Sequence, residues 1–151
     1  MKKIHTGRAL LGGFVAAVII DLIEGVVNGA LLKADWAAAM QALGKSGEVD
    51  GGAIAIYNIV GLLEGIIGVW MYAALTSRYG TGSKTAAKAG LVVFALASVL
   101  PNLMWVPAGV IPSRLMTIAV MTDFFAILLG VTFGSLLYRE EEVPAARSAH
   151  A

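Results

Sequence analysis

Four long apolar stretches dominate this sequence, and each is long enough to cross a lipid bilayer as a helix. They run over about residues 9–32, 52–76, 86–106 and 115–138. The hydrocarbon core of a bilayer is about 30 Å thick, which a helix of about 20 residues spans. Irregular backbone facing lipid would leave its polar groups without hydrogen bonds. The sequence therefore predicts an all-α protein, a bundle of four transmembrane helices.

The composition supports a membrane as the solvent of this protein. Of the 151 residues, 58% are hydrophobic and 14% are charged, whereas a soluble domain has roughly 45–50% apolar and about 25% charged residues. The net charge of +1 gives no reason to expect a nucleic-acid partner. The sequence contains no cysteine, which excludes disulfides, thiolate metal sites and thiol nucleophiles.

The basic residues that flank the stretches predict the orientation, because Lys and Arg are retained on the cytoplasmic side. Eight of them flank one side: Lys2, Lys3, Arg8, Arg78, Lys84, Lys88, Arg139 and Arg147. The other side has three, namely Lys33, Lys45 and Arg114. We therefore expect a multi-pass protein of the inner, cytoplasmic membrane with both termini in the cytoplasm.

The first connecting segment has the pattern of a short amphipathic helix. Trp36, Met40 and Leu43 recur at helical spacing between Asp35, a residue type that caps helix N-termini, and Gly44, a residue type that ends helices. A tryptophan at the membrane interface anchors such a helix. We expect this helix to lie on the outer surface of the membrane.

Proline and charge patterns define the remaining chain. Pro101 lies inside the third stretch and lacks the N–H that a helix needs, so a kink is expected there with Asn102 beside the freed backbone. Residues 139–151 are charged and Ala-rich, which predicts a disordered cytoplasmic tail. Residues 1–138 then form one transmembrane domain.

The stretches contain acidic residues that are unusual for a membrane interior. Asp21 and Glu24 lie in the first stretch, Glu64 in the second and Asp123 in the fourth. A charged side chain at the centre of a membrane helix costs about 2.5–3.5 kcal/mol on an insertion scale, so such residues are rare and usually functional. Three amides, Asn28, Asn58 and Asn102, extend this candidate binding site for an ion, proton or ligand.

Helical spacing predicts that these acids face other helices rather than lipid. Asp21, Glu24 and Asn28 share one helix face, and the other acids share faces with glycines. Small residues four apart are the surfaces on which membrane helices approach one another. The glycines expected to serve this packing are Gly25, Gly29, Gly61, Gly65, Gly68, Gly130 and Gly134.

No Lys, Arg or His lies in the interior of any stretch, so no internal salt bridge is available to neutralise the acids. Either most of them are protonated, or a cation or a positively charged ligand lies among them. A site of carboxylate and amide oxygens suits a hard cation such as Na⁺, Ca²⁺, Mg²⁺ or Mn²⁺. The residues that would bind a metal are Asp21, Glu24, Glu64 and Asp123.

No other cofactor is evident from the sequence. The two histidines, His5 and His150, lie near the termini, which excludes haem bound by two histidines within the membrane. The stretch interiors contain no lysine that could form the Schiff base of a retinal protein.

Three segments resemble an uncharacterised family of small bacterial four-span integral membrane proteins. They are RALLGGFVA from Arg8, WMYAAL from Trp70 with the following Arg78-Tyr79-Gly80, and SRLM from Ser113. The resemblance covers nearly the whole chain and implies the same four-span fold. No activity is established for that family, so the resemblance implies no functional residue.

Three functions are compatible with these features. The first is binding or translocation of a proton, a cation or a cationic small molecule by the intramembrane carboxylates, in a chain whose small size favours a homo-oligomer. The second is a non-catalytic accessory or assembly subunit of a larger membrane complex. The third is an enzyme that uses paired carboxylates, but the sequence has no nucleophile motif or cofactor lysine, so no enzyme is expected.

Overall fold

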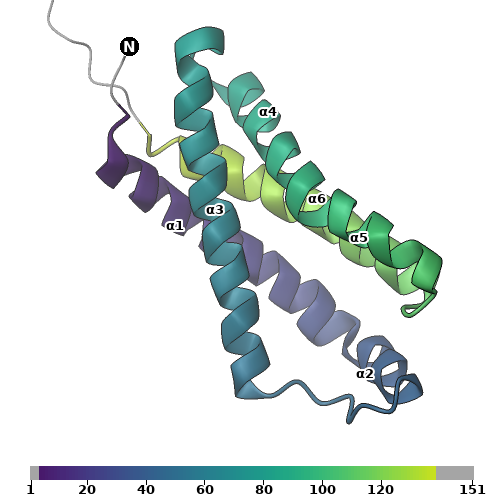
Figure 1. The fold of residues 1–151 in the computed structure, drawn as a ribbon. Coiled ribbons are helices and arrows are strands. Elements are labelled where there is room, and N and C mark those ends of the chain that lie inside the picture. Colours follow the sequence, from purple (N-terminus) through teal and green to yellow (C-terminus); the bar gives the residue numbers. More distant parts are fainter. Residues whose placement is uncertain (1–3, 139–151) are drawn as a thin grey trace, which may run out of the picture.

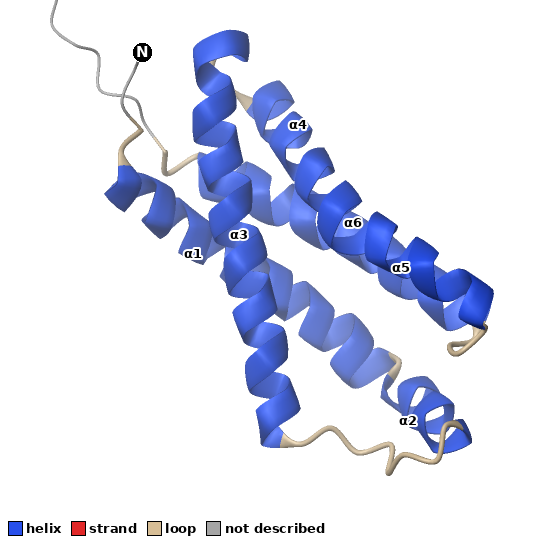
Figure 2. Ribbon diagram, viewed as in Figure 1, coloured by secondary structure: helices blue, strands red, loops and turns tan. Residues whose placement is uncertain are grey.

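The fold is that of a computed structural model, of which residues 4–138 are described. Within this range the chain is helical and forms no strand, as Figure 2 shows. The expected tail at 139–151, with Arg139, Arg147 and His150, lies outside the described residues, as do Lys2 and Lys3.

Four helices in this range are long and apolar enough to cross a membrane. They comprise residues Thr6–Leu31, Gly51–Tyr79, Ser83–Ala108 and Ser113–Ser135. Each of them overlaps one of the four stretches expected from the sequence, with ends that differ by a few residues. The all-α fold and the four apolar helices are therefore confirmed.

The first and third of the four spanning helices are interrupted by segments of wider, π-helical turns. The first spanning helix consists of α1 (Thr6–Glu24) and η1 (Gly25–Leu31), and η1 is the π-helical part. The second is α3 (Gly51–Tyr79). The third is built from α4 (Ser83–Phe94), the π-helical η2 (Ala95–Val99), α5 (Leu100–Trp105) and the 3₁₀ turn η3 (Val106–Ala108). The fourth is α6 (Ser113–Ser135).

The irregular turn of the third helix lies just before Pro101. Because proline has no N–H, it cannot continue the normal ladder of hydrogen bonds. The helix changes at η2 to hydrogen bonds five residues apart, and the Leu100 N–H donates to the Ala95 carbonyl. The side chain of Asn102 donates to the carbonyl of Ser98 at 2.9 Å. The disruption expected at Pro101 thus takes the form of a π-helical segment one turn earlier.

Helix α1 lies between α3 and α6 and makes its most extensive contacts with them. Figure 1 shows α1 crossing α3 near the middle of both helices. The backbones touch here: a Cβ added to Gly13 would lie 2.6 Å from Ile66 Cα, and one added to Gly65 would lie 2.6 Å from the Ala17 nitrogen. A Cβ at Gly134 of α6 would collide with the carbonyl oxygen of Gly12. Glycine is therefore required for this close packing.

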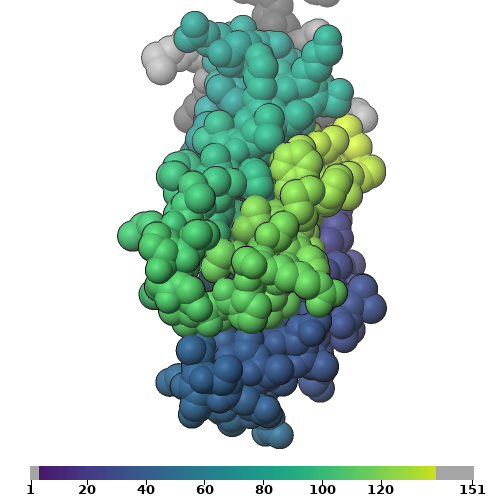
Figure 3. All heavy atoms as spheres, turned by 90° about the vertical axis from the view of Figure 1, so that its right-hand side faces the viewer, coloured from purple at the N-terminus to yellow at the C-terminus, as the bar shows by residue number. Residues whose placement is uncertain are grey.

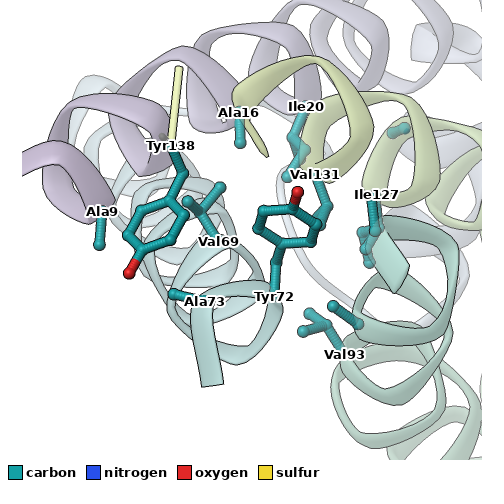
Figure 4. Packing of buried hydrophobic residues seen from close by; sticks show 13 residues of the cluster. Ala9, Ala16, Ile20, Val69, Tyr72, Ala73, Val93, Ile127, Val131 and Tyr138 are labelled. Atoms are coloured by element: carbon teal, nitrogen blue, oxygen red, sulfur yellow. The ribbon is translucent and has the colours of Figure 1, made fainter. Parts of the chain in front are cut away.

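The main hydrophobic core fills the half of the bundle that contains the turn between α3 and α4. Figure 4 shows Ile20 of α1, Val69 of α3 and Val131 of α6 meeting in it, with Val93 of α4 nearby. The methyl groups of Val131 occupy the space that a side chain at Gly68 would fill. Shape-matched apolar contacts therefore hold this half together.

A second, smaller apolar cluster joins the short helix α2 (Lys33–Ala42) to the beginning of α6. Its buried residues are Leu32, Ala39 and Leu115, and Trp36 and Ile111 pack against them. In Figure 3, α2 appears in blue below the green surface of α5 and α6. This cluster marks the end of the bundle opposite the main core, here called the α2 end.

The helix expected around Trp36 is therefore present, but it begins earlier than its expected cap. Its first residue is Lys33, so Asp35 lies in the first turn and is not the N-cap. Asp35 still suits that place, because an acidic side chain is favourable near a helix N-terminus. Gly44 follows the helix with a φ of +74°, as expected for a glycine that ends a helix.

The close packing predicts a large difference between two glycine-to-alanine variants. Gly134→Ala forces a methyl group against Gly12 and Ala16 and should lower the free energy of unfolding by about 1–3 kcal/mol. Gly29→Ala is the control, because nothing lies within 4 Å of its added Cβ. Denaturant unfolding in lipid nanodiscs, followed by circular dichroism, measures both. Equal stability of the two variants would contradict this packing.

Candidate functional site

The end of α1 brings the carboxyl group of Glu24 to that of Asp123 in α6. The two side chains lie within hydrogen-bonding range of each other, and both are half-buried. Glu24 Oε1 is shielded from solvent and receives no N–H or O–H donor within the described residues. Two carboxyl groups form a hydrogen bond only when one of them carries a proton. A hydrogen bond between Glu24 and Asp123 therefore requires a proton on one of the two groups.

Two further acids lie in the electrostatic neighbourhood of this pair. Glu64 of α3 is close enough to interact with Asp123 and Glu24, and Asp21 of α1 interacts with Glu64. The carboxylate of Asp21 lies over Gly61 and occupies the space that any larger side chain at position 61 would need. Gly61 thus holds an acidic side chain against the α3 backbone, in addition to allowing two helices to approach.

A hydroxyl group from the third spanning helix stabilises Asp123. Ser98, in η2, is 2% exposed and its Oγ donates a hydrogen bond to Asp123 Oδ2. Asn102 in turn donates to the carbonyl of Ser98. Asn102 is therefore connected to the pair through the backbone of Ser98 rather than by direct contact.

Two more side chains extend the network toward the α2 end. Asn28 Nδ2 donates to Glu24 Oε2 at 2.6 Å, and the indole N–H of Trp36 donates to Asn28 Oδ1 at 3.0 Å. Hydrogen bonds thus connect α2 through η1 with Glu24 of α1, and connect η2 with Asp123 of α6, while the two carboxyl groups adjoin each other between these halves. We call these residues, Trp36, Asn28, Glu24, Asp123 and Ser98, the polar network.

The polar network begins where the main core ends. Along α1 the fully buried core ends at Ile20, with the partly buried Ile23 packed against it, and Asp21 and Glu24 follow in the same turn. Along α6 the core begins at Ala126, one turn after Asp123. Both π-helical segments contribute a member, Asn28 in η1 and Ser98 in η2. Such wide turns are rare and are found frequently at functional sites.

Some residues expected in the site lie elsewhere. Asn58 is exposed and donates to the carbonyl of Ile54 in its own helix at 2.7 Å. It belongs to the first half of α3, which stands apart from the other helices in Figure 1. Gly25 and Gly29 are exposed, and an added Cβ would meet nothing within 4 Å at either position.

The other expected packing glycines do lie between helices. Gly61 and Gly65 face α1, Gly68 faces α6, and a Cβ at Gly130 would lie 2.7 Å from the carbonyl oxygen of Ala16. Gly134 meets Gly12 and Ala16 of α1. These glycines set the separation of the three helices that carry the acids.

Sequence reasoning did not identify Ser98 or the role of the Gly12–Gly13 pair. Ser98 is an isolated hydroxyl among Ala, Leu and Val in the third stretch, four residues before Asn102, and this is the signal that could have indicated it. Trp36 was expected to be an interfacial anchor. Nothing in the sequence connects it with Asn28, because the two are eight residues apart and separated by a change of helix.

Among residues 4–138, no group of three or more His, Cys, Asp and Glu side chains lies close enough together to hold a metal ion. The hard-cation site at Asp21, Glu24, Glu64 and Asp123 stays a prediction. Protein-family models, curated proteins and solved structures were compared with this chain, and none of them matches it. The function is therefore argued from the site alone.

A proton shared between Glu24 and Asp123 would give a specific spectroscopic signal. Infrared spectra of the protein in lipid should contain the C=O stretch of a protonated, hydrogen-bonded carboxyl group, which shifts when H₂O is exchanged for D₂O. Glu24→Gln should remove most of this band. Glu48→Gln, at an exposed loop carboxyl, should leave it unchanged. An identical band in the parent and in Glu24→Gln would show that Glu24 carries no such proton.

Proposed function

We propose that this protein binds and translocates a proton, in exchange for or together with a small cation or a cationic molecule, at the carboxyl groups of Glu24 and Asp123. The observation that carries the proposal is their hydrogen-bonding approach between α1 and α6. A proton held between two carboxyl groups can be exchanged without a large movement of either helix. Ionisable groups inside membrane helices mark ion pathways and proton relays.

Glu64 and Asp21 supply further steps for such an exchange. Glu64 approaches the pair from α3, and Asp21 lies one turn before Glu24 on α1. A cation that replaces the proton would find carboxylate oxygens from three helices and the amide of Asn28 nearby. This donor chemistry favours a proton or a hard cation over a soft metal.

The proposal includes the orientation of the chain in the inner membrane. The excess of Lys and Arg at the termini and on either side of the turn between α3 and α4 favours that side as cytoplasmic. The α2 end then faces outward, and α2 lies at the outer interface with Trp36 in the aromatic belt. On the same side, the ammonium of Lys88 in α4 lies 3.6 Å from the centre of the Tyr79 ring at the end of α3.

A second candidate function is supported by the exposed face of η1. Gly25 and Gly29 are four residues apart on a surface that no other part of the described chain covers. Such a surface suits the close approach of another membrane helix. This favours a homo-oligomer or membership of a larger membrane complex, in which the protein is an accessory subunit.

The orientation can be tested with single cysteines, because the natural sequence has none. A membrane-impermeant maleimide added to intact cells should label Ser46→Cys in the segment after α2. It should label Thr81→Cys, in the turn between α3 and α4, only after the membrane is permeabilised. Both positions are exposed, so access depends on the side of the membrane. The reverse pattern would contradict the proposed orientation.

Proton or cation movement can be measured in liposomes that contain a pH-sensitive dye. The parent protein should collapse an imposed proton or cation gradient. Glu24→Gln and Asp123→Asn should reduce the rate by tenfold or more, since general proton transfer by a positioned group contributes about 10²–10⁴-fold to a rate. Glu64→Gln and Asp21→Asn should also impair it.

The matched control is Glu48→Gln, which removes a carboxylate outside the four spanning helices. Circular dichroism in the same liposomes shows whether each variant remains helical. Parental rates in folded Glu24→Gln and Asp123→Asn would exclude this pair as the exchanging site.

A further inference from the structure

The hydrogen bonds of Asn28 connect the short helix α2 with the proposed proton site. The Asn28 amide accepts from the Trp36 indole and donates to Glu24 Oε2. An indole N–H only donates and a carboxylate oxygen only accepts, so the Asn28 amide has a single orientation that satisfies both neighbours. Loss of either neighbour removes that constraint.

The same contact engages one of the two oxygens of the Glu24 carboxyl group. Glu24 Oε2 is occupied by Asn28, while Oε1 is shielded from solvent and receives no donor within residues 4–138. Rotation of the carboxyl group would break the bond to Asn28. The position of Asn28, and through it that of Trp36, therefore orients the carboxyl group toward Asp123.

Helix α2 is attached to the bundle by few contacts. Its only buried residue is Ala39, and the cluster that holds it has three buried residues, compared with thirteen in the main core. The helix is followed by a loop in which Gly44 and Gly47 have positive φ. Regions with few buried apolar contacts open at lower free energy than the core. Helix α2 therefore has less buried apolar surface to lose on opening than the main core.

A hollow next to α2 gives Trp36 space to move. It has a volume of about 280 Å³ and is lined by Trp36, Met40, Asn102, Trp105 and Met116, among others. It lies between α2 and the corner that joins α5 to α6. The indole of Trp36 thus borders open space on one side and Asn28 on the other.

We infer that α2 is a lid over the Glu24–Asp123 pair, and that Trp36 and Asn28 are positioning residues that couple docking of the lid to the orientation of Glu24. With α2 docked, the two hydrogen bonds hold Glu24 against Asp123 and close access from the α2 end. When α2 separates, Asn28 and Glu24 are free to turn toward that end. This inference rests on the proposed function, since it names what controls access to the same site.

The coupling is tested by the hydrogen exchange of the Trp36 indole N–H. The chain has three tryptophans, so NMR of tryptophan-labelled protein resolves few signals, and Trp36→Phe assigns the one required. Asn28→Ala removes the acceptor of the indole and should accelerate exchange about fivefold, the effect of losing a typical hydrogen bond. Glu24→Ala should also accelerate exchange of the Trp36 indole N–H, because Glu24 acts on Trp36 through Asn28.

The Gln variant and a double variant distinguish coupling from general loosening. Glu24→Gln keeps an oxygen that accepts from Asn28, so exchange of the Trp36 indole should stay near the parental rate. Asn28→Ala combined with Glu24→Ala should exchange no faster than Asn28→Ala alone, because both act through one chain of contacts. Glu48→Ala, at an exposed loop carboxyl, serves as the control. Unchanged exchange in Asn28→Ala and Glu24→Ala would overturn the inference.

The lid itself is tested by deuterium uptake at the Glu24 carboxyl, followed in the infrared. Trp36→Phe keeps an aromatic ring in the α2 cluster and removes only the N–H, and it should accelerate uptake. Trp105→Phe, at another wall of the same hollow, should not. Equal uptake in the parent and Trp36→Phe would overturn the lid.

These measurements are independent of transport. Accelerated exchange without any gradient-driven flux would remove the proposed function and leave the coupling. Loss of flux in Glu24→Gln, combined with unchanged indole exchange in Asn28→Ala and unchanged deuterium uptake in Trp36→Phe, would support the proposed function and exclude the coupling.

Discussion

The close contact of α1 with α3 and α6 determines the rest of this structure. Glycines at 12, 13, 65 and 134 let the three backbones touch, where one added methyl group would collide with a neighbouring helix. In a membrane, such close packing replaces the hydrophobic effect as the force between helices. Because α1 is fixed against both neighbours in this way, its next turn carries Asp21 and Glu24 to Gly61, Glu64 and Asp123. The position of the acids thus follows from the packing of the apolar half.

The acids also explain why the apolar core gives way to the polar network halfway along the bundle. A carboxylate without a partner is costly in a low dielectric, and the spanning segments carry no basic residue in their interiors. The structure offers Asp123 a hydroxyl from Ser98 and offers Glu24 an amide from Asn28. Both partners come from π-helical segments, in which the normal helical register is interrupted.

The sequence located the four spanning helices and their acids because both signals are local. An apolar length sets a span, and glycines at helical spacing indicate which face of that span meets another helix. These signals do not show whether another helix is packed against that face at a given position along the bundle. Asn58 shows the difference: it lies on α3 like Glu64, but in the half of the helix that diverges from the bundle. Gly25 and Gly29 have the same spacing as Gly61 and Gly65, yet only the latter pair meets α1.

By itself, the sequence determined that this chain forms four apolar helices and that four carboxyl groups must be accommodated within them. Hydrophobic length and the absence of interior basic residues suffice for that conclusion, since both are properties of single segments. Only the tertiary structure decided which carboxyl groups meet, that Ser98 stabilises Asp123, and that Trp36 reaches Asn28 from a separate helix. These contacts join residues on different elements, and their geometry depends on how the helices cross and where their turns widen. Such features arise from the packing of the whole bundle.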